Sequence, residues 1–177
     1  MDKLKYLEHS IRNIPDFPKP GILFRDITTL LKDGKAFKAA IDCLYKKYKD
    51  QKIDKILAVE SRGFILGAAL AYKMGKGIVL VRKKGKLPYK TISAAYSLEY
   101  GTDTLEIHED AIAPQEKVLI IDDLLATGGT VSAVLNLAKK LKAKVVGLAF
   151  VIELVDLKGR KKLKGYPIYS VVKFSGE

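Results

Sequence analysis

Two adjacent carboxylates precede a turn of small and hydroxyl-bearing residues in segment 118–130, which reads VLIIDDLLATGGT. The four apolar residues 118–121 are long enough for a buried strand, which we expect to end at Asp122 and Asp123. The turn leads into a helix predicted over 131–141 from its apolar periodicity. The first amides of a helix have no partner within it, and the helix dipole favours a phosphate there. The residues of this predicted anion site are Ala126, Thr127, Gly128, Gly129 and Thr130.

Asp122 and Asp123 need a task other than binding the phosphate, because carboxylates repel an anion. Sugar hydroxyls or a metal ion are the natural partners of such a pair. The segment therefore predicts a site for a phosphorylated sugar. The alternative is an ordinary loop between a strand and a helix, in which the two acids are solvated or cap the helix. The chain contains neither G-x-x-x-x-G-K-[ST] nor G-x-G-x-x-G, which excludes a P-loop and a Rossmann fingerprint.

Polar loops also follow two other predicted strands. Strand 53–59 ends at the run ESRG (60–63), and strand 77–81 ends at the run RKKGK (82–86). Ligands of parallel α/β sheets bind beyond the carboxyl ends of the strands, so we expect these loops to lie near the anion site. The arrangement suits a substrate with two separated phosphate groups. Taken singly, Arg62 could be a solvated residue and the 83–84 lysine pair a surface run.

Strands alternate with helices along the chain, which favours an α/β fold with a central, mostly parallel sheet flanked by helices. The N-terminus resembles an amphipathic helix, and the proline-rich residues 13–30 should form an extended arm. Residues 85–103 should form a polar loop, and the basic residues 158–162 a surface loop. The other expected helices are 34–48 and 64–74, and the other expected strands are 104–108, 145–152 and 168–172.

Composition limits the classes of function. A chain of 177 residues with 48% hydrophobic and 29% charged residues is expected to form a single globular domain, 1–177. No stretch approaches the roughly 20 apolar residues of a membrane span, so we expect no membrane partner. The single cysteine, Cys43, excludes an internal disulfide and indicates a cytoplasmic location. The net charge of +12 comes mostly from scattered lysines without interleaved aromatic residues, so we expect no nucleic-acid partner.

Five segments between residues 14 and 160 occur in an order and spacing that match a known family. They read PDFPKPGILFRDIT, ESRGF, RKKGKLP, YSLEYGTDTLEIH and VLIIDDLLATGGT. Together they resemble the adenine phosphoribosyltransferase family of type I phosphoribosyltransferases. The resemblance implies the type I phosphoribosyltransferase fold, with a small N-terminal hood over about residues 1–33 and a flexible loop. It also implies transfer of ribose 5-phosphate from phosphoribosyl pyrophosphate (PRPP) to N9 of adenine, giving AMP and pyrophosphate with Mg2+, in a homodimer.

The resemblance also assigns the PRPP contacts. It implies that residues 126–130 hold the 5-phosphate, through backbone amides and two threonine hydroxyls. Asp122 and Asp123 would sit beneath the ribose hydroxyls, and no side chain is expected to ligate Mg2+ directly. Family members often have a cis peptide at the position of Glu60–Ser61. The residues expected around the pyrophosphate are Glu60, Ser61, Arg62, Arg82, Lys83 and Lys86.

For the base, the resemblance implies that Phe24 stacks on the purine while Leu23 and Arg25 present polar groups to its edge. From the residues alone, Phe24 could be a core residue, and Arg25 could pair with its neighbour Asp26. Glu99 matches the family's proposed acid–base, which would manage the proton on the purine imidazole. Tyr100 lies beside it in loop 85–103, which would close over the site. The alternative is a solvated Glu99 on a mobile loop.

Three other functions remain open at this point. A related transferase could use xanthine, hypoxanthine or orotate, but the LFRD arm and Glu99 argue against it. A regulator with this fold could sense PRPP and bind nucleic acid, but no segment is left to supply a DNA-binding appendage. A nucleotide-binding structural module would leave the expected flexible loop unexplained.

Overall fold

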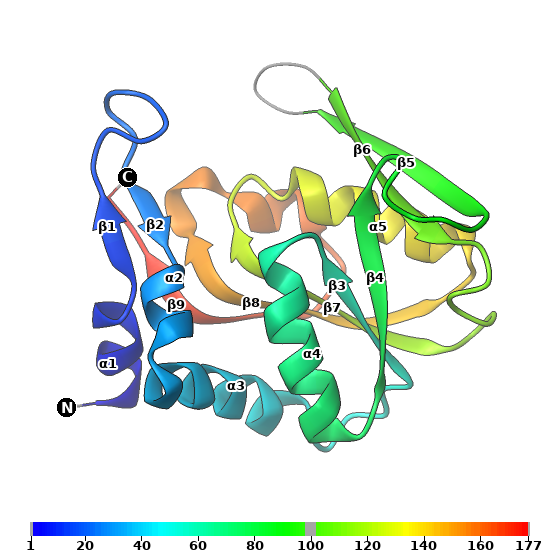
Figure 1. Ribbon diagram of the computed structural model, residues 1–177, viewed down its shortest axis with the longest axis horizontal. Helices are drawn as coiled ribbons and strands as arrows, with labels where there is room; N and C mark the ends of the chain where they lie inside the picture. Colours follow the sequence, from blue (N-terminus) through cyan, green and yellow to red (C-terminus); the bar gives the residue numbers. More distant parts are fainter. Residues whose placement is uncertain (1, 98–101, 177) are drawn as a thin grey trace.

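A computed structural model describes residues 2–97 and 102–176 (Figure 1). The helices of this part of the chain are α1 (Lys3–His9), α2 (Thr28–Lys32), α3 (Gly34–Tyr48), α4 (Arg62–Met74) and α5 (Gly129–Lys140), with the 3₁₀ turns η1 (Val155–Leu157) and η2 (Gly159–Leu163). Its strands are β1 (Arg12–Ile14), β2 (Phe24–Asp26), β3 (Lys55–Val59), β4 (Gly77–Lys83), β5 (Thr91–Ser97), β6 (Thr102–His108), β7 (Lys117–Leu125), β8 (Lys144–Leu154) and β9 (Ile168–Phe174).

Seven of the described strands form one sheet in the order β5-β6-β4-β3-β7-β8-β9 (Figure 1). β3 pairs in parallel with β4 and β7, and β8 pairs in parallel with β7 and β9. β6 runs antiparallel to β4 and β5. The predicted α/β fold with a central, mostly parallel sheet is confirmed. Because the parallel strands point the same way, the polar loops after β3, β4 and β7 share one edge of the sheet.

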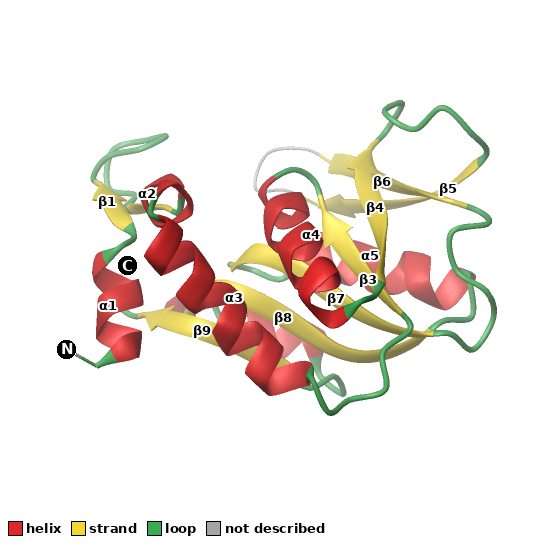
Figure 2. Cartoon of the chain, turned by 60° about the horizontal axis from the view of Figure 1, so that its bottom comes forward, coloured by secondary structure: helices red, strands yellow, loops and turns green. Residues whose placement is uncertain are grey.

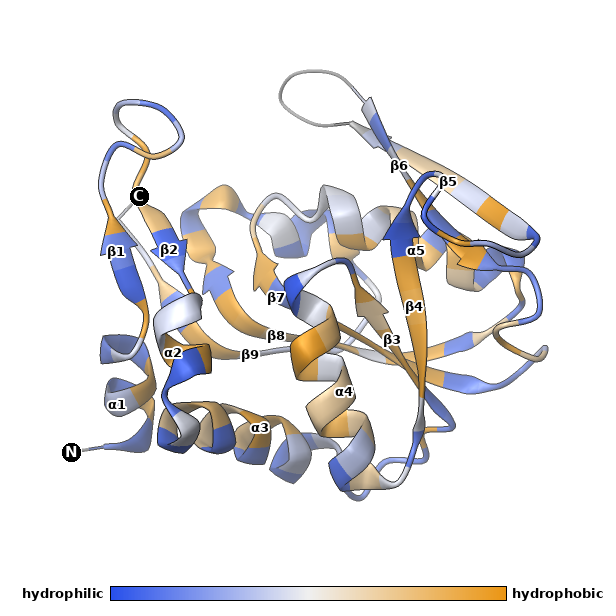
Figure 3. Ribbon diagram, in the orientation of Figure 1, coloured by the Kyte–Doolittle hydropathy of each residue, from blue (hydrophilic) through white to orange (hydrophobic). Residues whose placement is uncertain are grey.

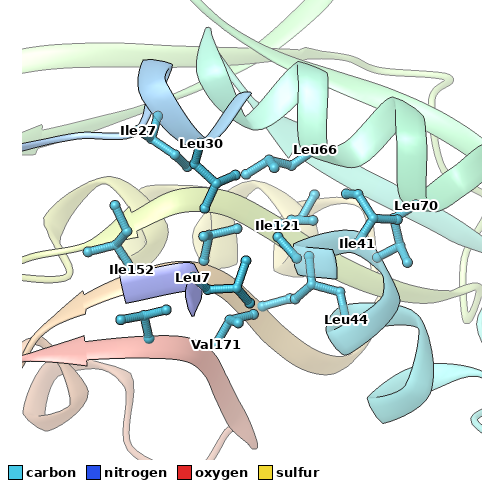
Figure 4. Packing of buried hydrophobic residues seen from close by; sticks show 14 of the residues in the cluster. Leu7, Ile27, Leu30, Ile41, Leu44, Leu66, Leu70, Ile121, Ile152 and Val171 are labelled. Atoms are coloured by element: carbon cyan, nitrogen blue, oxygen red, sulfur yellow. The ribbon is translucent and has the colours of Figure 1, made fainter. Parts of the chain in front are cut away.

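Helices flank the central strands of the sheet, with α3 and α4 on one side and α5 on the other (Figure 2). Alternate residues of a strand point to opposite faces, so Ile56 joins the core with α3 and α4, and Leu57 joins the core with α5. Figure 3 shows the resulting apolar runs in the central strands. In Figure 4, Leu44 and Leu66 pack with Ile121. Among the described helices, none is long and apolar enough to span a lipid bilayer.

Residues 2–33 contain α1, the two-stranded β1–β2 sheet and α2. Leu7 and Ile27 are buried in the core with α3 and α4, so this segment shares the main core. Arg12 pairs with Asp26 across the two strands, with 2.5 Å between Nη2 and Oδ2. The hydrogen bonds from Arg12 and Thr28 lower the pKa of Asp26 to about 2.

The local pair considered for Arg25 and Asp26 is therefore wrong, because Asp26 takes Arg12 as its partner. The Arg25 guanidinium donates to Asn13 Oδ1 at 2.7 Å and lies 4.1 Å from the centre of the Phe174 ring. Phe24 is half-buried and meets Phe17 edge to face, with 5.2 Å between ring centres.

Helix α3 has the predicted bounds, but four other predictions need correction. β7 does not end at Asp122, because Asp122, Leu124 and Leu125 continue to pair with β8. The arm predicted over 13–30 is wrong at its end, since α2 begins at Thr28. The loop predicted over 85–103 is wrong where β5 forms, because β5 pairs with β6 along its whole length. The basic segment 158–162 is more than a surface loop, since Gly159 is buried within η2.

Candidate active site

A cavity of about 410 Å³ opens at the carboxyl ends of β3 and β7. The turn between β7 and α5 forms one part of its wall, and the residues after β3 form another. This is the edge of the sheet at which α/β proteins bind ligands. The residues that line it are Glu60, Ser61, Arg62, Lys83, Tyr96, Leu105 and residues 122–131.

The turn between β7 and α5 exposes the start of a helix to the cavity. Gly128 precedes α5 with φ at +80°, a conformation that costs glycine little. Among the described residues, no side chain caps α5, and its first turn carries no acid. The amides at the start of a helix lack intrahelical acceptors, so residues 129–131 can donate to an anion. Thr127 is exposed and Thr130 half-buried, and both line the cavity.

Asp122 and Asp123 are both buried at the end of β7, with 8% and 7% of their surface exposed. The Asp122 carboxylate accepts the N–H of Asp123 at 2.8 Å. Arg62, the first residue of α4, donates from Nε to Asp123 Oδ2 at 2.5 Å. Burial and the charge of Asp123 raise the pKa of Asp122 well above its usual value. Two acids and one cation therefore meet on the floor of the cavity, where the negative charge of Asp122 is disfavoured.

The raised pKa of Asp122 gives a testable stability effect. A carboxyl group whose pKa is higher in the folded state holds its proton more tightly there, so its ionisation opposes folding as the pH rises above about 4. We expect Asp122→Asn to increase the free energy of unfolding at pH 8, because asparagine carries no charge to be disfavoured by burial. Near pH 4, where Asp122 stays protonated in the folded protein, the gain should be smaller. Urea unfolding at both pH values measures this, and an equal or negative change at pH 8 would contradict it.

The residues after β3 and the last two residues of β4 form a second charged group. The peptide bond between Glu60 and Ser61 is cis, as the sequence resemblance implies. The Glu60 carboxylate accepts the Lys83 N–H at 2.9 Å and lies 3.3 Å from Arg82 Nε. Burial alone would raise the pKa of Glu60, but these hydrogen bonds outweigh burial and lower it. The carboxylate therefore fixes the end of β4 against the residues that follow β3.

Lys83 lines the cavity, whereas Arg82 and Lys86 do not. Arg82 Nη1 donates to the backbone oxygen of Lys86 at 2.8 Å, which stabilises the turn that follows β4. Lys83 Nζ lies 3.3 Å from Asp103 Oδ2. The structure thus brings Arg82 and Lys86 next to the cavity residues without placing them in its wall.

Tyr96 is a cavity residue that sequence reasoning missed. Its hydroxyl donates to Asp103 Oδ2 at 3.2 Å, the carboxylate oxygen that also faces Lys83. Burial and the charge of Asp103 raise the pKa of Tyr96. The available signal was its place in the YSLEYG segment, three residues before Glu99. Leu105 was missed as well, since an apolar strand residue carries no chemical signature.

The residues expected to bind the base are not in the cavity wall. Leu23, Phe24 and Arg25 lie at and just before β2, and none of them lines the cavity. The loop before β2 and the β5–β6 hairpin project from the same side of the molecule (Figure 1). Glu99 and Tyr100 lie outside the described residues.

An α/β sheet with an uncapped helix start, an acid pair and cationic loops at one edge is an arrangement suited to binding a phosphorylated ligand there. Comparison with known proteins gives the class: residues 26–175 match the phosphoribosyl transferase domain family. An adenine phosphoribosyltransferase from Syntrophotalea carbinolica is 60% identical over 168 residues, which cover 95% of this chain and 98% of that protein. The chain therefore belongs to the phosphoribosyltransferase family, and within it to the adenine phosphoribosyltransferases.

Solved structures agree with this assignment. The adenine phosphoribosyltransferase of Thermoanaerobacter pseudethanolicus is 54% identical, with a TM-score of 0.94 over 97% of this chain and 99% of that one. The enzyme of Saccharomyces cerevisiae, complexed with D-2,5-dideoxy-2,5-imino-altritol 1,6-bisphosphate and adenine, is 39% identical. It has a TM-score of 0.91 over 96% of this chain and 98% of that one. The family resemblance of the five sequence segments is confirmed.

Proposed function

We propose that the chain transfers the 5-phosphoribosyl group of PRPP to N9 of adenine, giving AMP and pyrophosphate in purine salvage. One observation carries the proposal: the cavity joins the uncapped start of α5 to the buried acid pair and Arg62. This combination suits a sugar with a phosphate at one end and a pyrophosphate at the other. The base follows from membership of the adenine phosphoribosyltransferases.

For PRPP, we propose that residues 126–130 bind the 5-phosphate and that Asp122 and Asp123 accept from the ribose hydroxyls. The negative charge of the two acids also favours the positive charge that develops at C1. Glu60 and Ser61 shape the pyrophosphate end, where Arg62 and Lys83 stabilise the charge that the leaving group gains. Arg82 and Lys86 complete that end from the turn after β4. Arg62 has to share its donors between Asp123 and the pyrophosphate.

For the base, we propose that Phe24 stacks on adenine and that Leu23 and Arg25 contact its edge. The site must accept a hydrogen bond from the 6-amino group, since a buried polar group left unpaired rejects the wrong base. The C1–oxygen bond to pyrophosphate breaks while the N9–C1 bond forms. The N9 proton passes to the Glu99 carboxylate, and Tyr100 lies in the same segment, which we propose closes over the reactants as a flexible loop.

We propose that Mg2+ accompanies PRPP. This cation usually keeps several waters and binds substrate phosphates with one or two carboxylates, and Asp122, Asp123 and Glu60 line the cavity. Within the described residues, no three His, Cys, Asp or Glu side chains are grouped so that they could hold a metal ion. The side chains present therefore fit a Mg2+ ion that is bound mainly through substrate oxygens and water. When bound, Mg2+ would neutralise the leaving pyrophosphate.

The assembly and setting are proposed on more general grounds. We propose a homodimer, because isologous dimers are the commonest soluble oligomers. The single cysteine supports a reducing compartment such as the cytoplasm. Residues 1–177 form a single domain in this proposal, with about 1–33 as the base-binding hood. The proposed partners are small molecules only, with no nucleic acid and no membrane.

Pyrophosphate release with separate bases tests the proposed function. The chain is incubated with PRPP, Mg2+ and either adenine, hypoxanthine, xanthine or orotate, with a no-base control for PRPP hydrolysis. We expect release with adenine alone, and its loss when EDTA removes the metal. Release only with hypoxanthine or orotate would contradict the adenine assignment. No release with any base would favour a PRPP-sensing regulator.

A further inference from the structure

Gly159, in the basic segment after β8, contacts the back of the β7–α5 turn. A Cβ on Gly159 would lie 2.1 Å from the Ala126 carbonyl oxygen, and a Cβ on Gly128 would lie 2.8 Å from the Gly159 carbonyl oxygen. Both distances are too short for a methyl group, so the two backbones are in direct contact. Ala126 and Gly128 line the cavity and Gly159 does not. Gly159 therefore supports the turn from the side away from the cavity.

A partly buried ion pair between Arg160 and Glu153 holds Gly159 in this position. Arg160 donates from Nε to Glu153 Oε1 at 2.5 Å and from Nη2 to Oε2 at 2.7 Å. A third donor, Nη1, reaches the backbone oxygen of Ile168 at 3.3 Å, which also ties Arg160 to β9. A two-pronged contact between guanidinium and carboxylate fixes orientation as well as distance. The residue next to Gly159 is thus locked to two strands of the sheet.

The position of Glu153 connects this ion pair to the turn. Glu153 is 4% exposed and lies on β8 opposite Leu125, which is the residue just before the turn. Burial favours the neutral form of Glu153, but the hydrogen bonds from Arg160 and Ser170 and the charges of Arg160 and Lys173 together lower its pKa. On the other side of η2, Leu163 is buried in the same core as Leu125 and Val131. The turn and η2 are therefore attached to the same rigid elements.

We propose that Glu153, Gly159 and Arg160 form a brace that positions the β7–α5 turn and so sets its affinity for the 5-phosphate of PRPP. The three are positioning residues, because none lines the cavity. Backbone donors aimed at a phosphate act at full strength only when their positions are fixed in advance. The proposal rests on the proposed function for the identity of the phosphate, but the brace can be tested without turnover.

Arg160→Met tests the brace by removing the ion pair while keeping most of the apolar stem. We expect the Kd for ribose 5-phosphate, measured by calorimetry, to rise about tenfold, as small misplacements of binding groups weaken their contacts. KM for PRPP should rise by a similar factor, while KM for adenine stays within about twofold. Lys162→Met is the matched control: it removes the same charge from an exposed residue of η2, and we expect wild-type values.

A double variant separates positioning from stability. Arg160→Met leaves the Glu153 carboxylate buried without its partner, so the melting temperature should fall. Adding Glu153→Gln removes that buried charge and should recover part of the melting temperature, but the turn still lacks its brace. The affinity for ribose 5-phosphate should therefore stay weak in the double variant. Recovery of affinity together with stability would overturn the proposal.

Gly159→Ala addresses the backbone contact directly, and we expect at least the same loss of ribose 5-phosphate affinity if the variant folds. If it does not fold, Arg160→Met and the double variant decide. Unchanged affinity for ribose 5-phosphate in folded Arg160→Met would overturn the proposed brace. An equal increase in KM for PRPP and for adenine would overturn it as well. The Kd for ribose 5-phosphate is independent of catalysis. A wild-type chain that binds ribose 5-phosphate without using adenine would contradict the proposed function instead.

Discussion

Replacement of Asp123 by asparagine should lower kcat/KM for PRPP by about 10²- to 10³-fold, the range seen when a preorganised electrostatic contact is removed. Asp123 is buried at the cavity floor and accepts a hydrogen bond from Arg62. Asparagine keeps the shape of the side chain but loses the negative charge that would face the ribose and C1. It also presents donors where Arg62 needs an acceptor. Steady-state kinetics with varied PRPP measures the change.

Asp42→Asn is the control for loss of a paired carboxylate. Asp42 forms ion pairs with Lys38 and Lys73 and does not line the cavity. We expect its kcat/KM to stay within about twofold of wild type, as exposed ion pairs contribute little. An equal loss of kcat/KM in Asp42→Asn and Asp123→Asn would mean that the Asp123 substitution acts through folding. Near wild-type activity in Asp123→Asn would remove Asp123 from the site.

Replacement of Glu99 by glutamine should lower kcat by about 10²- to 10⁴-fold, the usual contribution of general acid–base catalysis. Glutamine cannot take the N9 proton as the bond to C1 forms. Since Glu99 is assigned to the base and not to PRPP, the Kd for PRPP should change little. Single-turnover kinetics and PRPP binding together measure both quantities. Glu99→Leu should give the same division between kcat and binding.

Glu109→Gln is the matched control, since Glu109 is an exposed glutamate that follows β6. We expect wild-type kinetics from it. Full activity in Glu99→Gln would exclude Glu99 from the mechanism. A weaker affinity for PRPP with unchanged kcat would instead assign Glu99 to substrate binding.

The sequence predicted the sheet well because its strands carry strong local signals. Buried parallel strands read as short apolar runs, and helix α3 combines clear periodicity with Asp33, whose side chain accepts the N–H groups of Lys35 and Ala36. The end of β7 was misplaced because Asp122 and Asp123 look like loop residues. Pairing with β8 keeps them in the strand, and only tertiary structure reveals that. β5 was missed for the same reason, as its pairing with β6 is not local.

The cavity residues at the strand ends were more predictable than the residues that support them. Residues 122–130 and 60–62 lie at or directly after the ends of strands, so the rule for strand ends brings them together. Tyr96 enters the cavity wall only through the β5–β6 pairing. Gly159 and Arg160 were assigned to a surface loop, because their contacts with Ala126 and Glu153 depend on how the chain returns after β8. The spacing of residues along the sequence does not show where the chain runs after β8.

Identification of the product tests the proposed reaction most directly. The chain is incubated with adenine, PRPP and Mg2+, and the nucleotide is analysed by NMR while pyrophosphate is quantified. The expected result is AMP with the ribose attached at N9, formed in equal amount to pyrophosphate. Pyrophosphate accompanied by free ribose 5-phosphate, or a nucleotide joined at another nitrogen, would contradict transfer to N9 of adenine.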